Sequence, residues 1–189
     1  MDYREDINNA LQVLRNGGII LYPTDTVWGL GCDATNGEAV ERIFQIKKRN
    51  EDKSLIILVN GLAMLERYVE FVPEAAINLI EVSDRPITII YPSGRNLADG
   101  VYAADGSAGI RICLDTFCNE LITKFRRPIV STSANVSGRI APVTFHEIDR
   151  EIIRSADYTV KYRQDDLNKT VPSSVIKFYN AGNFNIIRE

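Results

Sequence analysis

Hydrophobic residues recur along this chain at the spacing of amphipathic helices. Ile7, Ala10, Leu11 and Leu14 fall on one helix face, and the Gly-Gly pair at 17–18 predicts where that helix stops. The pattern predicts helices at residues 7–14, 38–48, 62–68, 74–81, 114–125 and 145–154.

Short apolar runs of the kind that form buried strands lie between these helices. Strands are expected at residues 19–22, 55–59, 87–91, 110–113, 128–130, 158–161, 174–179 and 184–188. The stretch 92–108, rich in Gly, Ala, Ser and Asp, is expected to be a surface loop. Because strands alternate with helices and no linker divides the chain, the sequence predicts one layered α/β domain over residues 1–189.

Composition narrows the class of protein. The chain has 189 residues, no apolar run reaches the ~18 residues of a membrane-spanning helix, and the charged N-terminus lacks a secretory signal. Cys32, Cys113 and Cys118 are odd in number and lie in apolar surroundings, which is typical of reduced core thiols in a cytoplasmic protein. The single histidine, His146, excludes a histidine-rich metal centre and is expected at the surface. The net charge of −3 argues against nucleic-acid binding through overall charge.

A basic segment closes the helix predicted at 38–48. Lys47 follows Phe44 by three residues on the apolar face, so its side chain should point inward, and Arg49 and Lys53 come soon after it. Two interpretations remain open, an anion-binding site or charges that complement the helix C-terminal dipole. If Lys47 only ends the apolar face, Lys47→Ala should change the stability little.

Hydroxyl and amide side chains crowd the segment 131–138 (STSANVSG), directly after the strand predicted at 128–130. Ligands in α/β sheets bind beyond the carboxyl ends of strands, and such side chains suit phosphate oxygens or a nucleobase edge. A Ser/Asn turn that caps a helix is the alternative.

Two arginines stand in apolar contexts. Arg111 lies between Ile110 and Ile112, so it should either emerge at a cleft or meet an anion. Arg188, near the end of the chain, either lies at a cleft or beside an anion, as expected for Arg111, or is solvated. The glycines of Gly29-x-Gly31 loosely match a dinucleotide-binding fingerprint, but a tight turn is the interpretation we favour for them.

Three segments, in this order and spacing, resemble the YrdC/TsaC family of threonylcarbamoyl-AMP synthases: 22–30 (YPTDTVWGL), Lys47-x-Arg49 and 131–138. The resemblance implies a twisted mixed sheet with flanking helices around a deep cavity. It implies a nucleotidyltransferase that makes threonylcarbamoyl-AMP and pyrophosphate from L-threonine, bicarbonate and ATP. The product would pass to a tRNA threonylcarbamoyltransferase complex.

The resemblance also implies roles for individual residues. The catalytic core would be Lys47, Arg49, Ser133 and Asn135. L-threonine would be bound by Thr24, Arg111, Ser131 and Ser173. The nucleotide would be bound by Lys47, Arg49, Lys53, Ser133, Asn135 and Arg188. No metal ligand is implied in the protein, and Mg²⁺ would arrive with ATP.

The chain departs from the family pattern at Asn50, at Asp84-Arg85, at Ala141 and at Pro172. These departures concern nucleotide affinity and rate, and they leave the charged core whole. A second hypothesis is a non-catalytic RNA-binding accessory protein that uses the same basic cavity. The intact K-x-R and S-x-N pairs favour the enzyme, and any double-stranded RNA binding is expected to be weak and salt-sensitive.

Overall fold

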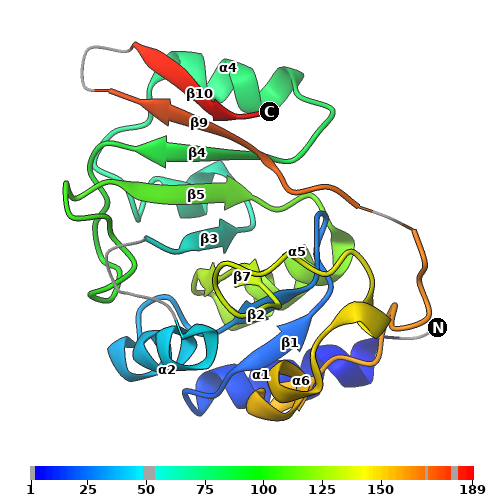
Figure 1. Cartoon of the computed structure of the whole chain (residues 1–189). Helices are drawn as coiled ribbons and strands as arrows, with labels where there is room; N and C mark the ends of the chain where they lie inside the picture. Colours follow the sequence, from blue (N-terminus) through cyan, green and yellow to red (C-terminus); the bar gives the residue numbers. More distant parts are fainter. Residues whose placement is uncertain (1–2, 49–53, 169, 180–182) are drawn as a thin grey trace.

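The strands form two mixed sheets flanked by helices (Figure 1). This computed structural model describes residues 3–48, 54–168, 170–179 and 183–189. The smaller sheet has the order β7-β2-β1-β8 and comprises β1 (Ile20–Tyr22), β2 (Gly29–Gly31), β7 (Thr132–Ser133) and β8 (Tyr158–Thr159). The larger sheet has the order β10-β9-β4-β5-β3-β6 and comprises β3 (Ile56–Val59), β4 (Ile87–Tyr91), β5 (Ala108–Ile112), β6 (Ile129–Val130), β9 (Ser174–Phe178) and β10 (Phe184–Arg188). The predicted α/β class is confirmed, with its strands divided between two sheets.

One short segment, 129–133, joins the two sheets. Its first half, β6, pairs with β3 of the larger sheet, and its second half, β7, pairs with β2 of the smaller one. At the crossing point the Ser131 amide donates a hydrogen bond to the Ile56 carbonyl at 2.7 Å. The hydroxyl-rich segment singled out in the sequence therefore lies at the junction of the sheets.

The helices follow the predicted apolar faces. They are α1 (Arg4–Arg15), α2 (Gly37–Lys47), α3 (Leu62–Leu65), α4 (Glu74–Val82), α5 (Thr116–Phe125) and α6 (Arg150–Ser155). Helix α1 ends, as predicted, before Gly17, which adopts a φ of +73° that suits glycine. The single helix predicted over 145–154 is wrong, because a 3₁₀ turn at Phe145–Glu147 and α6 replace it. The Asp149 side chain accepts a hydrogen bond from the Glu151 amide at 2.9 Å and so caps the N-terminus of α6.

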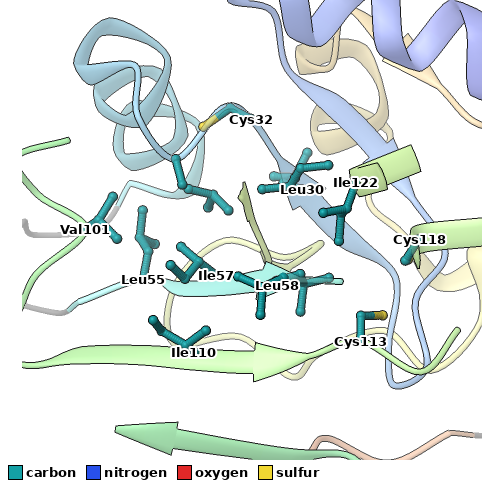
Figure 2. Close-up of a cluster of buried hydrophobic side chains, with 14 of the residues drawn as sticks. Leu30, Cys32, Leu55, Ile57, Leu58, Val101, Ile110, Cys113, Cys118 and Ile122 are labelled. Atoms are coloured by element: carbon teal, nitrogen blue, oxygen red, sulfur yellow. The ribbon is translucent and has the colours of Figure 1, made fainter. Parts of the chain in front are cut away.

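Buried hydrophobic side chains from both sheets form one core (Figure 2). Leu30 of β2, Leu58 of β3 and Ile122 of α5 are fully buried within it. The cysteines named above are all buried free thiols, as predicted. Val101 is also fully buried, so the stretch 92–108 is not simply a surface loop. No helix in the parts of the chain described is long and apolar enough to cross a membrane.

Strand β2 was not predicted, and its glycines explain both its sequence and its position. A Cβ atom on Gly31 would lie 2.6 Å from the ring of Tyr22 and 2.7 Å from the Val130 carbonyl oxygen. The hydroxyl of Tyr22 donates to that same carbonyl at 3.2 Å. Gly31 therefore permits close approach of neighbouring strands, and the interpretation of these glycines as a tight turn is wrong.

Candidate active site

A cavity of about 290 Å³ is lined by residues from both sheets. Its polar lining consists of Thr26, Ser54, Arg111, Ser131, Thr132, Ser133, Ser173 and Arg188. Ala141 and Pro172, two of the departures from the family pattern, also line it. The described lining contains two guanidinium groups and several hydroxyls but no carboxylate, so it offers donors to the anionic groups of a ligand.

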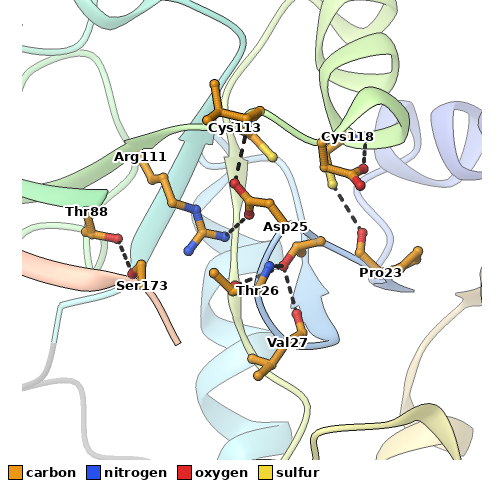
Figure 3. A network of polar contacts seen from close by, with 12 residues as sticks. Pro23, Asp25, Thr26, Val27, Thr88, Arg111, Cys113, Cys118 and Ser173 are labelled. Atoms are coloured by element: carbon orange, nitrogen blue, oxygen red, sulfur yellow. Dashed lines mark hydrogen bonds and ion pairs between the residues drawn. The ribbon is translucent and has the colours of Figure 1, made fainter. Parts of the chain in front are cut away.

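Arg111 projects from β5 into this cavity and is 4% exposed. Its NH2 atom lies 3.0 Å from Oδ1 of Asp25, whose side chain is also buried (Figure 3). Its Nε atom has no hydrogen-bond partner among the described residues. The sequence predicted that Arg111 either reaches a cleft or meets an anion, and the structure shows both. Nothing in the sequence indicated that Asp25 would be this anion.

The loop between β1 and β2 places two threonines differently. The hydroxyl of Thr24 accepts a hydrogen bond from the Thr26 amide at 3.0 Å and donates one to the Val27 carbonyl at 2.8 Å. Thr24 is buried and does not line the 290 Å³ cavity, whereas Thr26 does. Thr24 thus holds the loop in shape, whereas Thr26, which the sequence analysis did not select, lines the cavity, with its hydroxyl 3.0 Å from that of Thr24.

The structure brings Lys47, Ser133 and Asn135 together. Lys47 is 2% exposed, and its Nζ atom donates hydrogen bonds to the backbone carbonyls of Ser133 and Asn135, the second at 2.8 Å. The Ser133 hydroxyl donates to Oδ1 of Asn135. The inward direction predicted for Lys47 is confirmed. Of the three residues only Ser133 lines the cavity, so Lys47 supports its wall from behind.

This arrangement argues against the expectation that Lys47→Ala would leave the stability almost unchanged. Two carbonyl oxygens would lose a charged donor in a partly buried setting. The other predicted residues of this basic segment, Arg49 and Lys53, and the departure at Asn50 lie outside the described residues.

Ser131, Ser173 and Arg188 line the cavity. The buried Ser173 hydroxyl lies 2.7 Å from that of Thr88. Nε and NH2 of Arg188 donate to the Ser173 carbonyl at 3.1 and 2.8 Å, which fixes the end of β10 against the cavity wall. Arg188 is exposed, so both proposed environments, site and solvent, apply to it.

Two buried groups next to the loop between β1 and β2 stay protonated. Burial raises the pKa of the Tyr22 phenol and of the Cys118 thiol well above their ordinary values. The Cys118 thiol donates to the Pro23 carbonyl at 3.2 Å, at the start of the loop that carries Asp25. Neither group is a ready nucleophile, which fits a site that binds anions through fixed charges and hydroxyls. His146 is exposed, as predicted.

Comparison with known proteins decides the family. The sequence model of Sua5/YciO/YrdC, described as "Telomere recombination", matches residues 12–189. The chain belongs to this family. It is 31% identical over 183 residues to the threonylcarbamoyl-AMP synthase of Pseudoalteromonas translucida, which covers 94% of this chain and 95% of that protein. The resemblance drawn from the three sequence segments is thereby confirmed.

Solved structures of family members share the fold. The chain is similar to Escherichia coli YciO, with a TM-score of 0.84, 24% identity and coverage of 98% of this chain and 89% of that one. It is similar to P. abyssi Sua5 complexed with L-threonine, with a TM-score of 0.79, 28% identity and coverage of 92% of this chain. The chain spans about half (51%) of the P. abyssi protein.

Proposed function

We propose that this chain is an L-threonylcarbamoyladenylate synthase that acts as a single domain. The observation that carries the proposal is Arg111, a buried guanidinium group with an unpartnered Nε on a cavity lined by hydroxyls and a second arginine. The name of the Pseudoalteromonas translucida relative and the L-threonine complex of P. abyssi Sua5 support the same function.

The proposed reaction joins three substrates. The amino group of L-threonine attacks the carbon derived from bicarbonate, which forms a carbamate and releases water. A carbamate oxygen then attacks the α-phosphorus of ATP, and the bond to the β,γ-phosphates breaks to release pyrophosphate. Both steps bring anions together, so the site must neutralise negative charge rather than supply a covalent nucleophile.

Each residue of the cavity is assigned a substrate group according to its position. We assign the α-carboxylate of threonine to Arg111, whose guanidinium group offers a fork of donors, with hydroxyls of Thr26, Ser131 and Ser173 around it. Arg188 lies on the same cavity and would meet the nucleotide. Thr24 would contribute by shaping the loop of Thr26.

Lys47 and Asn135 would act through the segment that they support. Their contacts hold Ser133 at the cavity wall and give the backbone around it a fixed shape. Arg49 and Lys53, named from the resemblance alone, would extend the positive charge toward the phosphates. Lys47, Arg49, Ser133 and Asn135 remain the catalytic core of the proposal.

ATP would bring its own magnesium ion. The residues described contain no group of three or more histidine, cysteine, aspartate or glutamate side chains placed to hold a metal ion. We propose that the ATP phosphates, rather than a protein cage, hold Mg²⁺ as part of the substrate, as is usual for Mg²⁺ bound with a nucleotide.

We further propose a cytoplasmic enzyme that hands its product to a tRNA threonylcarbamoyltransferase complex. The net charge of −3 favours only weak, salt-sensitive contact with RNA. The names of the relatives support the enzyme and not the RNA-binding accessory protein. Tight tRNA binding that persists in moderate salt would revive the accessory function.

Pyrophosphate release tests the proposal. Purified protein is incubated with Mg-ATP and bicarbonate, with L-threonine, L-serine, glycine or no amino acid. We expect release that depends on L-threonine and is not matched by serine at equal concentration. Equal release with serine, glycine or no amino acid would contradict the assignment.

A further inference from the structure

Asp25 and Arg111 form a buried ion pair directly beside the cavity (Figure 3). The two side chains are 9% and 4% exposed, and each keeps one atom without a hydrogen-bond partner among the described residues, Oδ1 of Asp25 and Nε of Arg111. Oδ1 faces NH2 of Arg111 at 3.0 Å, and Oδ2 accepts a hydrogen bond from the Leu114 amide at 3.4 Å. The carboxylate is therefore held between the Arg111 side chain of β5 and the backbone just after that strand, at Leu114.

The charge of this pair decides which ligands suit it. A buried guanidinium group alone carries one positive charge and would favour any carboxylate. With Asp25 at its side the pair is neutral, so a simple carboxylate would leave one negative charge in a poorly solvated place. An amino acid carries an ammonium group as well as a carboxylate, so the net charge of the ion pair and the ligand together stays at zero. Arg188 also lies on the cavity, but it is exposed, so water screens its charge at the Arg111 end of the cavity. Arg163 is paired with Asp115 at 2.7 Å.

We propose that Asp25 is a specificity-determining, positioning residue that restricts the Arg111 site to zwitterionic amino acids and rejects carboxylates that lack an amino group. This inference rests on the proposed function, since it assumes that Arg111 binds the α-carboxylate of threonine. The proposal adds to that function a selection for the amino group of the substrate, because only a ligand with an amino group can form the carbamate.

Asp25 acts through Arg111 and not by contact with the reacting atoms. Asp25 does not line the 290 Å³ cavity, whereas its neighbour Thr26 and its partner Arg111 do. The ion pair engages NH2, whereas Nε, the neighbouring donor on the same edge of the guanidinium group, has no hydrogen-bond partner among the described residues. The carboxylate thus both orients this edge and sets the local charge.

The test compares two ligands that differ only in the amino group, L-threonine and (R)-3-hydroxybutyrate, by isothermal titration calorimetry. For the unaltered protein we expect threonine to bind at least ~10-fold more tightly, since uncompensated like charge at a buried site is costly. In Asp25→Asn this ratio should fall by ~10-fold or more, because hydroxybutyrate gains affinity while threonine loses it. Asp25→Glu keeps the charge and should keep most of the preference.

Asp33→Asn is the matched control. Asp33 is also a buried aspartate paired with an arginine, Arg127, at 2.7 Å, but neither residue lines the cavity. Its threonine-to-hydroxybutyrate ratio should equal that of the parent. A merely structural role of Asp25 would weaken both ligands together in Asp25→Asn and leave the ratio unchanged, and that result would overturn the proposal.

The possible failures are distinguishable. If the unaltered protein binds threonine and hydroxybutyrate equally, this inference falls even if Asp25→Asn does not fold. If the protein prefers threonine and the preference survives in folded Asp25→Asn, the inference falls and the proposed function stands. If the protein binds neither ligand and releases no pyrophosphate with threonine, the proposed function itself falls.

Discussion

The Nζ atom of Lys47, at the end of α2, lies 2.8 Å from the backbone carbonyl oxygen of Asn135, 88 positions away in the sequence. Through this contact the helix supports the segment that crosses from one sheet to the other. The Ser137 amide donates in turn to the Lys47 carbonyl at 2.9 Å. The charged end of a helix and a hydroxyl-rich loop are thus one structural unit beside the cavity.

Lys47→Ala should therefore lose stability as well as activity. The partly buried carbonyls of Ser133 and Asn135 would lose a charged donor, at a cost of about 2 kcal/mol. That corresponds to a fall of roughly 4–8 °C in Tm for a chain of this size. Pyrophosphate release should fall by ~100-fold or more at a temperature where the variant is folded, because the preorganised site is lost.

Lys48→Ala is the control for this prediction. Lys48 is the next residue, but its side chain is 62% exposed and pairs with Glu151 at 3.1 Å on the surface. Exposed pairs contribute little, so both Tm and turnover should stay near the parent values. A Lys47→Ala protein that melts and turns over like Lys48→Ala would refute the supporting role.

Thr24 and Thr26 should differ in what their loss affects. Thr24→Val removes the acceptor for the Thr26 amide and the donor to the Val27 carbonyl, so it should lower the free energy of unfolding by about 1–3 kcal/mol. Thr26→Val removes a hydroxyl from the cavity lining, so it should raise the KM for threonine by about 10-fold and leave the KM for ATP near that of the parent. Thermal melts and steady-state kinetics on both variants measure the difference. The reverse pattern, with the KM effect confined to Thr24→Val, would return the substrate contact to Thr24.

The three cysteines should resist modification in the folded protein. Burial raises the pKa of the Cys32 and Cys118 thiols, so these groups stay protonated above pH 8, and Cys113 is buried as well. Because the thiolate is the reactive form, Ellman's reagent at pH 8 should label none of them until denaturant is added, and then all three. Rapid labelling of the native protein would show that the core around α5 opens.

The local spacing of hydrophobic residues was enough to predict the helices and strands that have long apolar faces. Helix α2 buries Val40, Ile43 and Phe44, and the same periodicity placed Lys47 correctly on the inner side. Arg111 could be selected because a charge between two isoleucines needs a special environment. These inferences depend on neighbours in sequence, and the structure confirms them.

Other features depend on residues far apart and left no local signal. Strands β2 and β7 are three and two residues long, and they exist because segments 29–31 and 132–133 pair with each other across the junction of the sheets. Asp25 lies in a polar loop, and only the fold shows that it meets Arg111, 86 positions later. Whether Thr24 or Thr26 contacts the substrate likewise depends on the fold, because the Thr24 hydroxyl forms hydrogen bonds with the backbone of its own loop.

The most direct test of the central claim is to follow the carbon of bicarbonate. Radiolabelled bicarbonate is incubated with Mg-ATP, L-threonine and either the parent protein or Arg111→Ala, and the nucleotide products are separated. We predict that the parent transfers label into an adenylate only when threonine and ATP are both present, and that Arg111→Ala forms at least ~100-fold less, since a charge-stabilising and orienting group is gone. A labelled adenylate that forms without threonine, or at the parental rate in folded Arg111→Ala, would contradict the account, as would the absence of label from every nucleotide formed by the parent.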